Sequence, residues 1–190
     1  GDVKISNLCT EIFQLQETST INDYGVEDEI RRDISCNLGS LNIANVMDSK
    51  KVRESVHDGI EALTVVSDDT AIANAPGVKK ANDELHSVGL GAMNLHGYLT
   101  KNKIAYESEE AKDFANVFFM LLNYYSLEKS MMISMERGQT FKDFERSDYA
   151  TGEYFDKYVN NSYEPVTDKV KPLFEDIYIP TKEDWAELRD

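Results

Sequence analysis

A short segment near the start of the chain, SNLCTEIF at residues 6–13, combines an amide, a thiol and a carboxylate. Asn7, Cys9 and Glu11 follow one another at two-residue spacing. In an extended strand, residues i, i+2 and i+4 share a face, so these three side chains would project together as a polar row with one sulfur. The alternative is that Cys9 is a small buried hydrophobic residue, the usual setting of a free cysteine.

Cysteine usage limits the kind of thiol chemistry to expect. The chain has two cysteines, Cys9 and Cys36, too few for the disulfide framework of a small secreted protein. The first residues lack the apolar stretch of an export signal. We therefore expect a reducing, cytoplasmic location, where any pairing of these thiols is catalytic or redox-linked.

Histidine spacing predicts no metal site. His57, His86 and His96 are scattered, without a second His or Cys at ligand spacing. His86 and His96 flank a glycine-rich segment that lacks the spacing of a phosphate-binding loop, so tight packing and hydrogen-bonded structural histidines are expected there.

Composition indicates a soluble globular protein. The 190 residues are 41% hydrophobic and 29% charged, enough to form one domain with a real core. There is no apolar run of about 18 residues, so no membrane association is expected. A net charge of −15 argues against binding nucleic acid through its phosphates.

The first half of the chain reads as strands and one helix. We expect a strand over 3–16, a loop or hairpin connection over 17–32 and a short strand or extended turn over 34–41. A helix from about 50 to 73 would be capped by Asp48 or Ser49 and ended by Pro76-Gly77. A buried strand over 88–93 and a helical turn over 94–100 follow.

The second half is predicted to be helical. Ser108 begins a long helix that ends near Arg137 and Gly138, with apolar residues on more than one face, so it should be the centre of the core. Its methionines and aromatic residues are interpreted as core packing. Residues 147–158 suggest a short helix or an irregular packed segment. Two short helices are expected over 167–176 and 181–189, the second with Thr181 and Asp184 as capping pair.

Several motifs together resemble a known family. SNLCTEI followed by ISCNLGSLNI resembles the catalytic subunit of class I ribonucleotide reductase. The segments HSVGLGAMNLHGYL, FANVFFMLLNYYSLEKS, SDYATGEYFDKYV and IPTKEDWAEL resemble its class Ib branch in the same order. The resemblance covers essentially all 190 residues.

The resemblance implies a role for each residue of the polar row. Cys9 matches the cysteine that becomes a thiyl radical and takes the 3′ hydrogen of the ribose, and Glu11 matches the general base for the 3′-hydroxyl. Asn7 matches the amide that hydrogen-bonds a substrate hydroxyl. Cys36 matches one of two thiols that supply the electrons for loss of the 2′-hydroxyl, and Leu38 beside it would help to exclude water.

The resemblance also implies what the chain holds and lacks. Residues 1–190 would be one incomplete, helix-rich α/β domain, the central part of a ten-stranded α/β barrel with the finger segment that carries Cys9. In the family, the thiol partner of Cys36, the specificity site and the main dimer contacts lie upstream. The diphosphate loop, the radical-path tyrosines and a C-terminal cysteine pair lie downstream. We therefore expect the chain alone to be inactive.

Cofactors and partners follow from the same resemblance. The chain itself would bind no cofactor, whereas the family uses a dinuclear manganese or iron tyrosyl-radical centre on a separate small (beta) subunit, and nucleoside triphosphate effectors. Partners would be the remaining segments of the catalytic subunit, the small subunit, a thioredoxin or glutaredoxin-like reductant and a ribonucleoside diphosphate. Two alternatives stay open: one piece of a naturally split enzyme, and a non-catalytic interaction or regulatory module. The second is weakened because Asn7, Cys9, Glu11 and Cys36 are all present.

Overall fold

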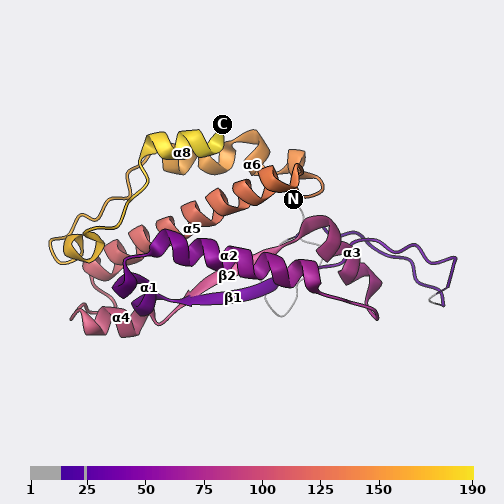
Figure 1. Cartoon of the computed structure of the whole chain (residues 1–190), viewed down its shortest axis with the longest axis horizontal. Helices are drawn as coiled ribbons and strands as arrows, with labels where there is room; N and C mark the ends of the chain where they lie inside the picture. The colour runs from indigo at the N-terminus through magenta and orange to yellow at the C-terminus, as the bar shows by residue number, and fades with distance from the viewer. Residues whose placement is uncertain (1–13, 24) are drawn as a thin grey trace. The chain divides into compact units, whose positions relative to one another are not determined.

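The structure is a computed structural model of the chain, and it describes residues 14–23 and 25–190 (Figure 1). The chain divides into two compact units. The first unit comprises Gly1–Leu38 and Leu63–Gly89, and the second comprises Gly39–Ala62 and Leu90–Asp190.

The first unit contains a two-segment antiparallel arm. Glu17 donates its backbone N–H to the carbonyl of Arg32 at 2.8 Å, and Thr20 and Glu29 exchange backbone hydrogen bonds of 3.0 and 2.9 Å. The backbone of residues 17–20 therefore pairs with that of residues 29–32 in one register, which confirms the hairpin alternative of the predicted connection. Most of the strand predicted over 3–16 lies outside the described residues.

A helix that the sequence interpretation missed, α3 (Pro76–Leu85), packs beside this arm. The expectation that Pro76-Gly77 only ends the preceding helix was wrong, because Pro76 opens α3. Proline suits the first turn of a helix, where its missing N–H has no partner to lose. The backbone N–H of Asp33 donates to the Gly77 carbonyl at 3.0 Å, which fixes the arm to the start of α3.

Two parallel strands form the sheet of the described chain. β1 (Asn37–Asn42) and β2 (Val88–Met93) confirm both strand predictions, although β2 is half-buried rather than buried. Gly89 lies against Leu38 and Gly91 lies against Ser40, so the two strands run in the same direction. Parallel strands need a long crossover connection, which the intervening helices supply.

Two helices, rather than the single predicted one, follow β1. In α1 (Ile43–Ser49), the Asn42 side chain accepts from the N–H of Asn45, and Lys50 ends the helix in the left-handed conformation. The next helix, α2, spans Val52–Asp69. Asp48 and Ser49 are thus the last residues of α1 and not the N-cap of α2, which corrects the predicted cap. An apolar run as short as that of α1 does not separate from its neighbour by periodicity alone.

In the second unit, the long helix α5 (Glu109–Arg137) has the predicted ends. The Ser108 hydroxyl accepts from the Ala111 N–H at 3.2 Å, and Gly138 closes the helix in the left-handed conformation. Its buried residues lie in its first five turns: Ala111, Phe114, Val117, Phe118, Met120, Leu121, Leu122, Tyr124 and Tyr125. The interpretation of its methionines as core packing was wrong for Met131 and Met135, which are exposed in the last turns.

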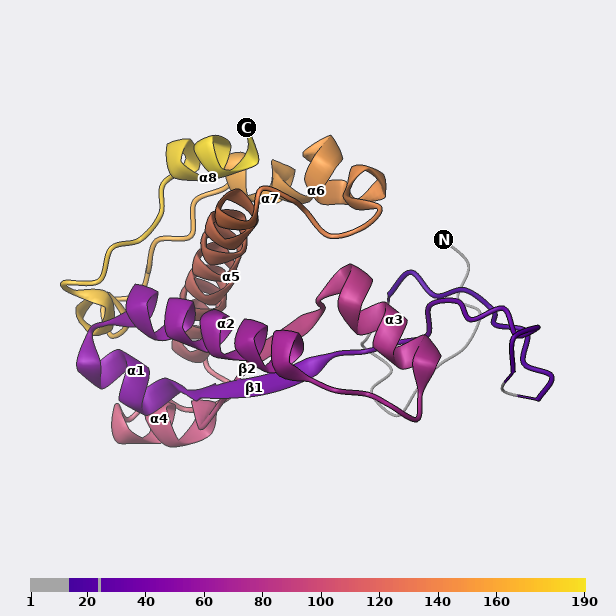
Figure 2. The same ribbon diagram turned by 45° about the vertical axis from the view of Figure 1, so that its right-hand side comes forward.

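Shorter elements complete the second unit. The predicted turn after β2 is confirmed as α4 (Leu95–Lys101), which packs on α1 in both ribbon views (Figures 1 and 2). The helix predicted over 167–176 is reduced to one 3-10 turn, and the last helix has the predicted Thr181–Asp184 capping box. The remaining elements are η1 (Phe144–Arg146), α6 (Asp148–Thr151), η2 (Glu153–Phe155), α7 (Asp156–Val159), η3 (Lys171–Phe174) and α8 (Lys182–Arg189).

The C-terminal helices are held on α5 by an aromatic cluster. The Trp185 ring of α8 is buried and stacks on Tyr158 of α7, with ring centres 3.9 Å apart and planes inclined by 7°. Tyr124 of α5 meets the same Trp185 edge-on at 4.9 Å. Offset and edge-on aromatic pairs of this kind add about 0.5–1.5 kcal/mol to the area they bury.

Candidate functional site

The structure describes two of the five predicted site residues. Asn7, Cys9 and Glu11 lie outside the described residues. Cys36 and Leu38 belong to the first unit. Cys36 directly precedes β1, and Leu38 is the second residue of that strand. Cys36 is half-buried, whereas 61% of Leu38 is exposed.

The backbone next to Cys36 is held from one side by Gln14. Its side-chain N–H donates to the Ser35 carbonyl at 2.7 Å, and its Oε1 accepts from the Ser35 N–H at 3.3 Å. At this end of the antiparallel arm, the Gln14 side-chain amide thus pairs with the backbone N–H and C=O of Ser35, as the backbone of a neighbouring strand would. Gln14 stands only five residues after Cys9 in the sequence.

A second amide, Asn82 of α3, contacts both neighbours of Cys36. Its Oδ1 accepts from the Asn37 Nδ2 at 3.2 Å and from the Ser35 hydroxyl at 3.5 Å. Only 2% of Asn82 is exposed. A buried amide group needs partners for its donors and acceptors, and here two of the donors to its oxygen come from the residues on either side of the cysteine.

Ser67 fixes the orientation of the Asn82 amide. The Ser67 hydroxyl donates to Asn82 Oδ1 at 3.0 Å, and Asn82 Nδ2 donates to the Ser67 carbonyl at 2.8 Å. Ser67 is itself 1% exposed. His86 lies next to it, with Nδ1 3.5 Å from the Ser67 hydroxyl and 3.6 Å from an Asp68 carboxylate oxygen. The contact with the Ser67 hydroxyl agrees with the predicted hydrogen bonding of His86, and its structural role stays a prediction.

Gly89 leaves room for the side chains at this end of β1. A Cβ added to Gly89 would lie 2.6 Å from Leu38 Cδ2 and 3.4 Å from the Cys36 sulfur. The first distance is shorter than real contacts of a Cβ atom. Glycine here permits a close approach of β2 to Leu38 and Cys36.

A buried arginine joins the arm to α3. Arg32 is 3% exposed and lies 3.5 Å from both the Glu17 and the Glu84 carboxylates. A buried guanidinium is costly unless it is paired, so these two carboxylates make its position possible. Lys80 of α3 adds a hydrogen bond of 3.0 Å to the Ile30 carbonyl. These contacts fix the helix that carries Asn82 to the segment that leads into Cys36.

The arrangement provides a thiol on a rigid support. The chain segment that bears Cys36 is held by two side-chain amides, and the sulfur itself is half-buried beside a glycine. Within residues 14–23 and 25–190, no three His, Cys, Asp or Glu side chains gather as metal ligands would. What this site can supply chemically is a positioned thiol for exchange or electron donation.

Sequence reasoning missed both supporting amides. One signal could have found Asn82: it occupies an apolar position in the helical series Val78, Ala81, Asn82 and Leu85, and an amide there must find buried partners. No comparable pattern marks Gln14, whose partner lies 21 residues away.

In the second unit, α2 and α5 are joined by an ionic cluster around Glu128. Arg53 donates two hydrogen bonds to the Glu128 carboxylate, at 2.9 and 3.0 Å, and His57 Nε2 lies 2.8 Å from it. Burial alone would raise the pKa of Glu128, but the hydrogen bonds and charges of Arg53 and His57 outweigh it and hold that pKa below its usual value. Nearby, burial and adjacent carboxylates raise the pKa of Tyr124 to about 12.

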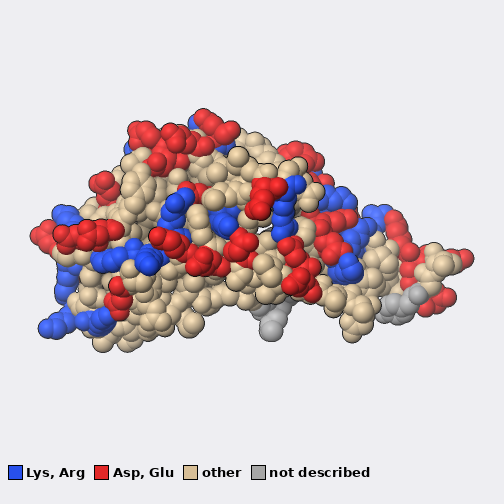
Figure 3. Space-filling view, viewed as in Figure 1, with Lys and Arg blue, Asp and Glu red and all other residues tan. Residues whose placement is uncertain are grey.

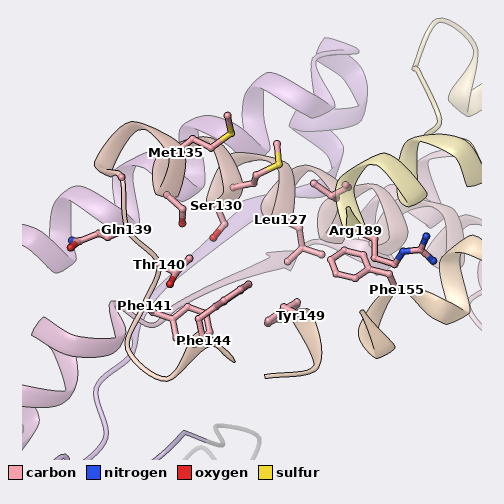
Figure 4. Close-up of a pocket in the computed structure, with 14 residues that line it drawn as sticks. Leu127, Ser130, Met135, Gln139, Thr140, Phe141, Phe144, Tyr149, Phe155 and Arg189 are labelled. Carbon is pink, nitrogen blue, oxygen red and sulfur yellow. The ribbon is translucent and has the colours of Figure 1, made fainter. Parts of the chain in front are cut away.

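A second feature of this unit is an open, mainly apolar hollow of about 740 Å³ (Figure 4). Phe141 and Phe144 line one side of it and Tyr149 and Phe155 another, while the exposed Met135 lies at its edge. The methionines of these last α5 turns therefore do not serve as core packing within the described chain. Of the predicted site residues, the two that the structure describes, Cys36 and Leu38, do not line this hollow.

The face drawn in Figure 3 carries acidic and basic side chains interspersed, with the acidic ones more frequent. This agrees with a chain of 35 acidic and 20 basic residues. Within the described part of the chain, no helix combines the length and apolar character that crossing a membrane requires.

Comparison with known proteins shows the class of protein. The model of the ribonucleotide reductase barrel domain matches residues 1–190, and the chain therefore belongs to this family. The match confirms the resemblance noted in the sequence, and the structure confirms a helix-rich α/β fold.

Particular relatives are alpha subunits of ribonucleoside-diphosphate reductases. The Bacillus subtilis subunit is 56% identical over 187 residues, 98% of this chain and 27% of the relative. A subunit of Bacillus phage SPbeta is 52% identical over 98% of this chain and 17% of its own length. The Mycoplasma pneumoniae subunit is 44% identical over 98% of this chain and 26% of its own length. The chain thus spans about a quarter or less of these relatives.

Proposed function

We propose that this chain forms part of the class Ib catalytic subunit of a ribonucleoside-diphosphate reductase, which makes deoxyribonucleoside diphosphates for DNA synthesis. The observation that carries the proposal is its 56% identity, over 98% of its length, to the Bacillus subtilis alpha subunit. The chain also has the whole set Asn7, Cys9, Glu11 and Cys36. The supported position of the Cys36 segment suits a thiol that must react in one geometry.

In this proposal, the reaction begins at Cys9. Its thiyl radical takes the 3′ hydrogen of the ribose, so that an S–H bond forms and the C3′–H bond breaks. An S–H bond is weak enough for this exchange to run near thermoneutrality in both directions. Glu11 takes the proton of the 3′-hydroxyl as general base, and Asn7 hydrogen-bonds a substrate hydroxyl.

Cys36 supplies reducing power in the next step. The bond between C2′ and its oxygen breaks, and the hydroxyl leaves as water with a proton from the thiol pair. Cys36 and a second thiol give up two electrons and two protons in total and end as a disulfide. Cys9 returns hydrogen to C3′, which regenerates its radical. In sum, one ribonucleoside diphosphate and two thiols are converted to one deoxyribonucleoside diphosphate, one disulfide and one water.

The second thiol comes from another part of the subunit in this proposal. The chain has two cysteines, and Cys9 must stay free to carry the radical. Leu38 helps to exclude water from the radical intermediates. Residues 1–190 form one incomplete domain of a ten-stranded barrel, with Cys9 on its finger segment.

The remaining components lie outside the chain. A small subunit with a dinuclear manganese or iron tyrosyl-radical centre starts the radical, and a thioredoxin or glutaredoxin-like protein reduces the disulfide. Nucleoside triphosphates act as effectors, and the assembly works in the cytoplasm. The other segments of the catalytic subunit complete the substrate site.

The test is CDP reduction with the small subunit and dithiothreitol. We expect turnover when this chain's sequence stands within a complete catalytic subunit, and none from the chain alone. Turnover by the isolated chain would refute the proposed division of the site. Absence of turnover by the complete subunit would refute the proposed activity.

Variants of the two thiols test their separate roles. In the complete enzyme, Cys9→Ser should abolish tritium release from 3′-labelled substrate. Cys36→Ser should still release tritium while making no deoxynucleotide. Identical behaviour of both variants would show that the assignment is wrong.

A further inference from the structure

We propose that Asn82 is a positioning residue for Cys36, acting through the residues on either side of it; this inference rests on the proposed function of Cys36. One amide oxygen accepts hydrogen bonds from Asn37 Nδ2 at 3.2 Å and from the Ser35 hydroxyl at 3.5 Å. Asn82 thus spans the cysteine without touching the reacting sulfur, and it holds the segment on both sides of it.

The amide is oriented independently of the cysteine segment. Ser67 accepts from Asn82 Nδ2 through its carbonyl and donates to Oδ1 through its hydroxyl, at 2.8 and 3.0 Å. These two bonds pair one N–H and one lone pair of the amide, and they fix its orientation without any atom of the cysteine segment. The further bonds to Ser35 and Asn37 are the ones that a positioning role explains.

The support itself is rigid. Asn82 is 98% buried on α3, and α3 is tied to the cysteine segment by the Asp33 N–H bond to Gly77 and by the pairing of Arg32 with Glu84. Movement of Asn82 relative to Cys36 would require these contacts to break together. The oxygen is therefore a fixed reference point for the Cys36 backbone.

The proposed chemistry of Cys36 needs such a reference point. A disulfide forms only when the two Cα atoms lie about 4.4–6.8 Å apart with the correct sulfur torsion. A thiol is a weak hydrogen-bonding group, so its placement has to come from its backbone. Misplacement of a reacting group by about 1 Å costs up to roughly 100-fold in rate.

The first experiment measures coupling in the complete reductase. For Asn82→Ala we expect 3′-tritium release to fall less than about twofold, while deoxycytidine diphosphate formed per tritium released falls roughly tenfold. A purely structural role would lower both quantities together. Equal losses, or no change in the ratio, would overturn the proposal.

Two further variants sharpen this result. Asp83→Ala is the matched control, because Asp83 follows Asn82 on α3 and its side chain is 48% exposed. It should leave the ratio unchanged. The double variant Ser35→Ala/Asn37→Ala removes the donors and keeps Asn82, so it should reproduce the loss. Combining it with Asn82→Ala should add little, because the residues act as one unit. Full additivity would contradict the proposal.

The second experiment needs no catalytic activity. In the full 190-residue chain with Cys9→Ser, Cys36 is the single remaining thiol, and its reaction rate with iodoacetamide is measured. Asn82→Ala should raise this rate at least threefold, and Asp83→Ala should not. An unchanged rate would overturn the positioning role even if the proposed reaction is correct. Inactivity of the wild-type reductase would refute the proposed function and leave this measurement valid.

Discussion

At the scale of single residues, the environment of Cys36 depends on very few atoms. Gln14 and Asn82 hold the neighbouring residues, and the missing Cβ of Gly89 leaves space beside the sulfur. The half-buried sulfur therefore stands on a backbone segment that is held from two sides.

Gly89→Ala tests the space beside the sulfur. The new methyl group would lie 3.4 Å from Cys36 Sγ and would push the exposed end of Leu38 aside. We expect roughly 1 kcal/mol of lost stability, because Leu38 can move, and a several-fold slower reaction of Cys36 with iodoacetamide in the Cys9→Ser chain.

Gly91→Ala is the matched control, because a Cβ there would meet its nearest atom, the Ser40 hydroxyl oxygen, at an ordinary 3.6 Å. It should leave the alkylation rate unchanged. Equal rates for Gly89→Ala and wild type would show that the glycine does not control access to the sulfur.

The sequence motifs singled out the two thiols, but they did not reveal the residues that support Cys36. Cys9 and Cys36 stand in local motifs that are read directly from the chain. Asn82 meets Asn37 across 45 residues, and Gln14 meets Ser35 across 21. Such contacts depend on how helices and strands pack, and one sequence does not specify that packing through local patterns.

At the scale of elements, local signals succeeded where they were unambiguous. Helix α5 begins after its N-cap Ser108 and ends at its C-cap Gly138, as predicted, because the capping residues act within one turn of the helix end. Pro76 misled because proline both ends a preceding helix and suits the first turn of a new one. Burial along α5 was overestimated, because apolar periodicity does not reveal which neighbours are present to cover each turn.

Adjacent phenylalanines on α5 give a matched test of the core. Phe118 is fully buried, whereas Phe119 is 42% exposed. Phe118→Ala should lower the free energy of unfolding by about 3–5 kcal/mol, since it leaves a cavity. Phe119→Ala should cost less than about half of that. Urea denaturation of the two variants measures the difference, and equal losses would contradict the burial of this helix face.

The cluster around Glu128 predicts a pH dependence. Its pKa is lowered in the folded state, so the stabilisation is complete above the ordinary carboxyl pKa of about 4.3 and is lost as the pH falls through the folded value. Glu128→Gln should cost roughly 1 kcal/mol at pH 7, a modest figure because Arg53 is 54% exposed.

The cost of Glu128→Gln should shrink as the pH falls below the ordinary carboxyl pKa of about 4.3, because the unfolded wild-type chain then binds a proton that the folded carboxylate resists binding. Urea denaturation at pH 7 and at pH 3.5 checks this. Glu136→Gln, at an exposed position of the same helix, serves as the control and should show no such trend. A constant difference between Glu128→Gln and wild type at both pH values would exclude the carboxylate as its source.

At the scale of the whole molecule, the family and the element types were predictable, and the division into two compact units was not. The family motifs are spread along the chain, and they can be recognised in a single sequence. The boundary between units cuts through β1, α2 and β2, so no linker composition marks it.

The antiparallel arm has a practical consequence. Its pairing is closed at Thr20 and Glu29, and beyond that point Val26 is fully exposed. The entropy of closing a loop rises only with the logarithm of its length, about 0.6 kcal/mol per doubling. A peptide tag or fluorescent label spliced into this tip would therefore leave the clamp between Gln14 and Ser35 in place. A label at this tip would report on the segment that carries Cys36 when the chain is part of a larger assembly. None of the residues that support this segment would have to be changed.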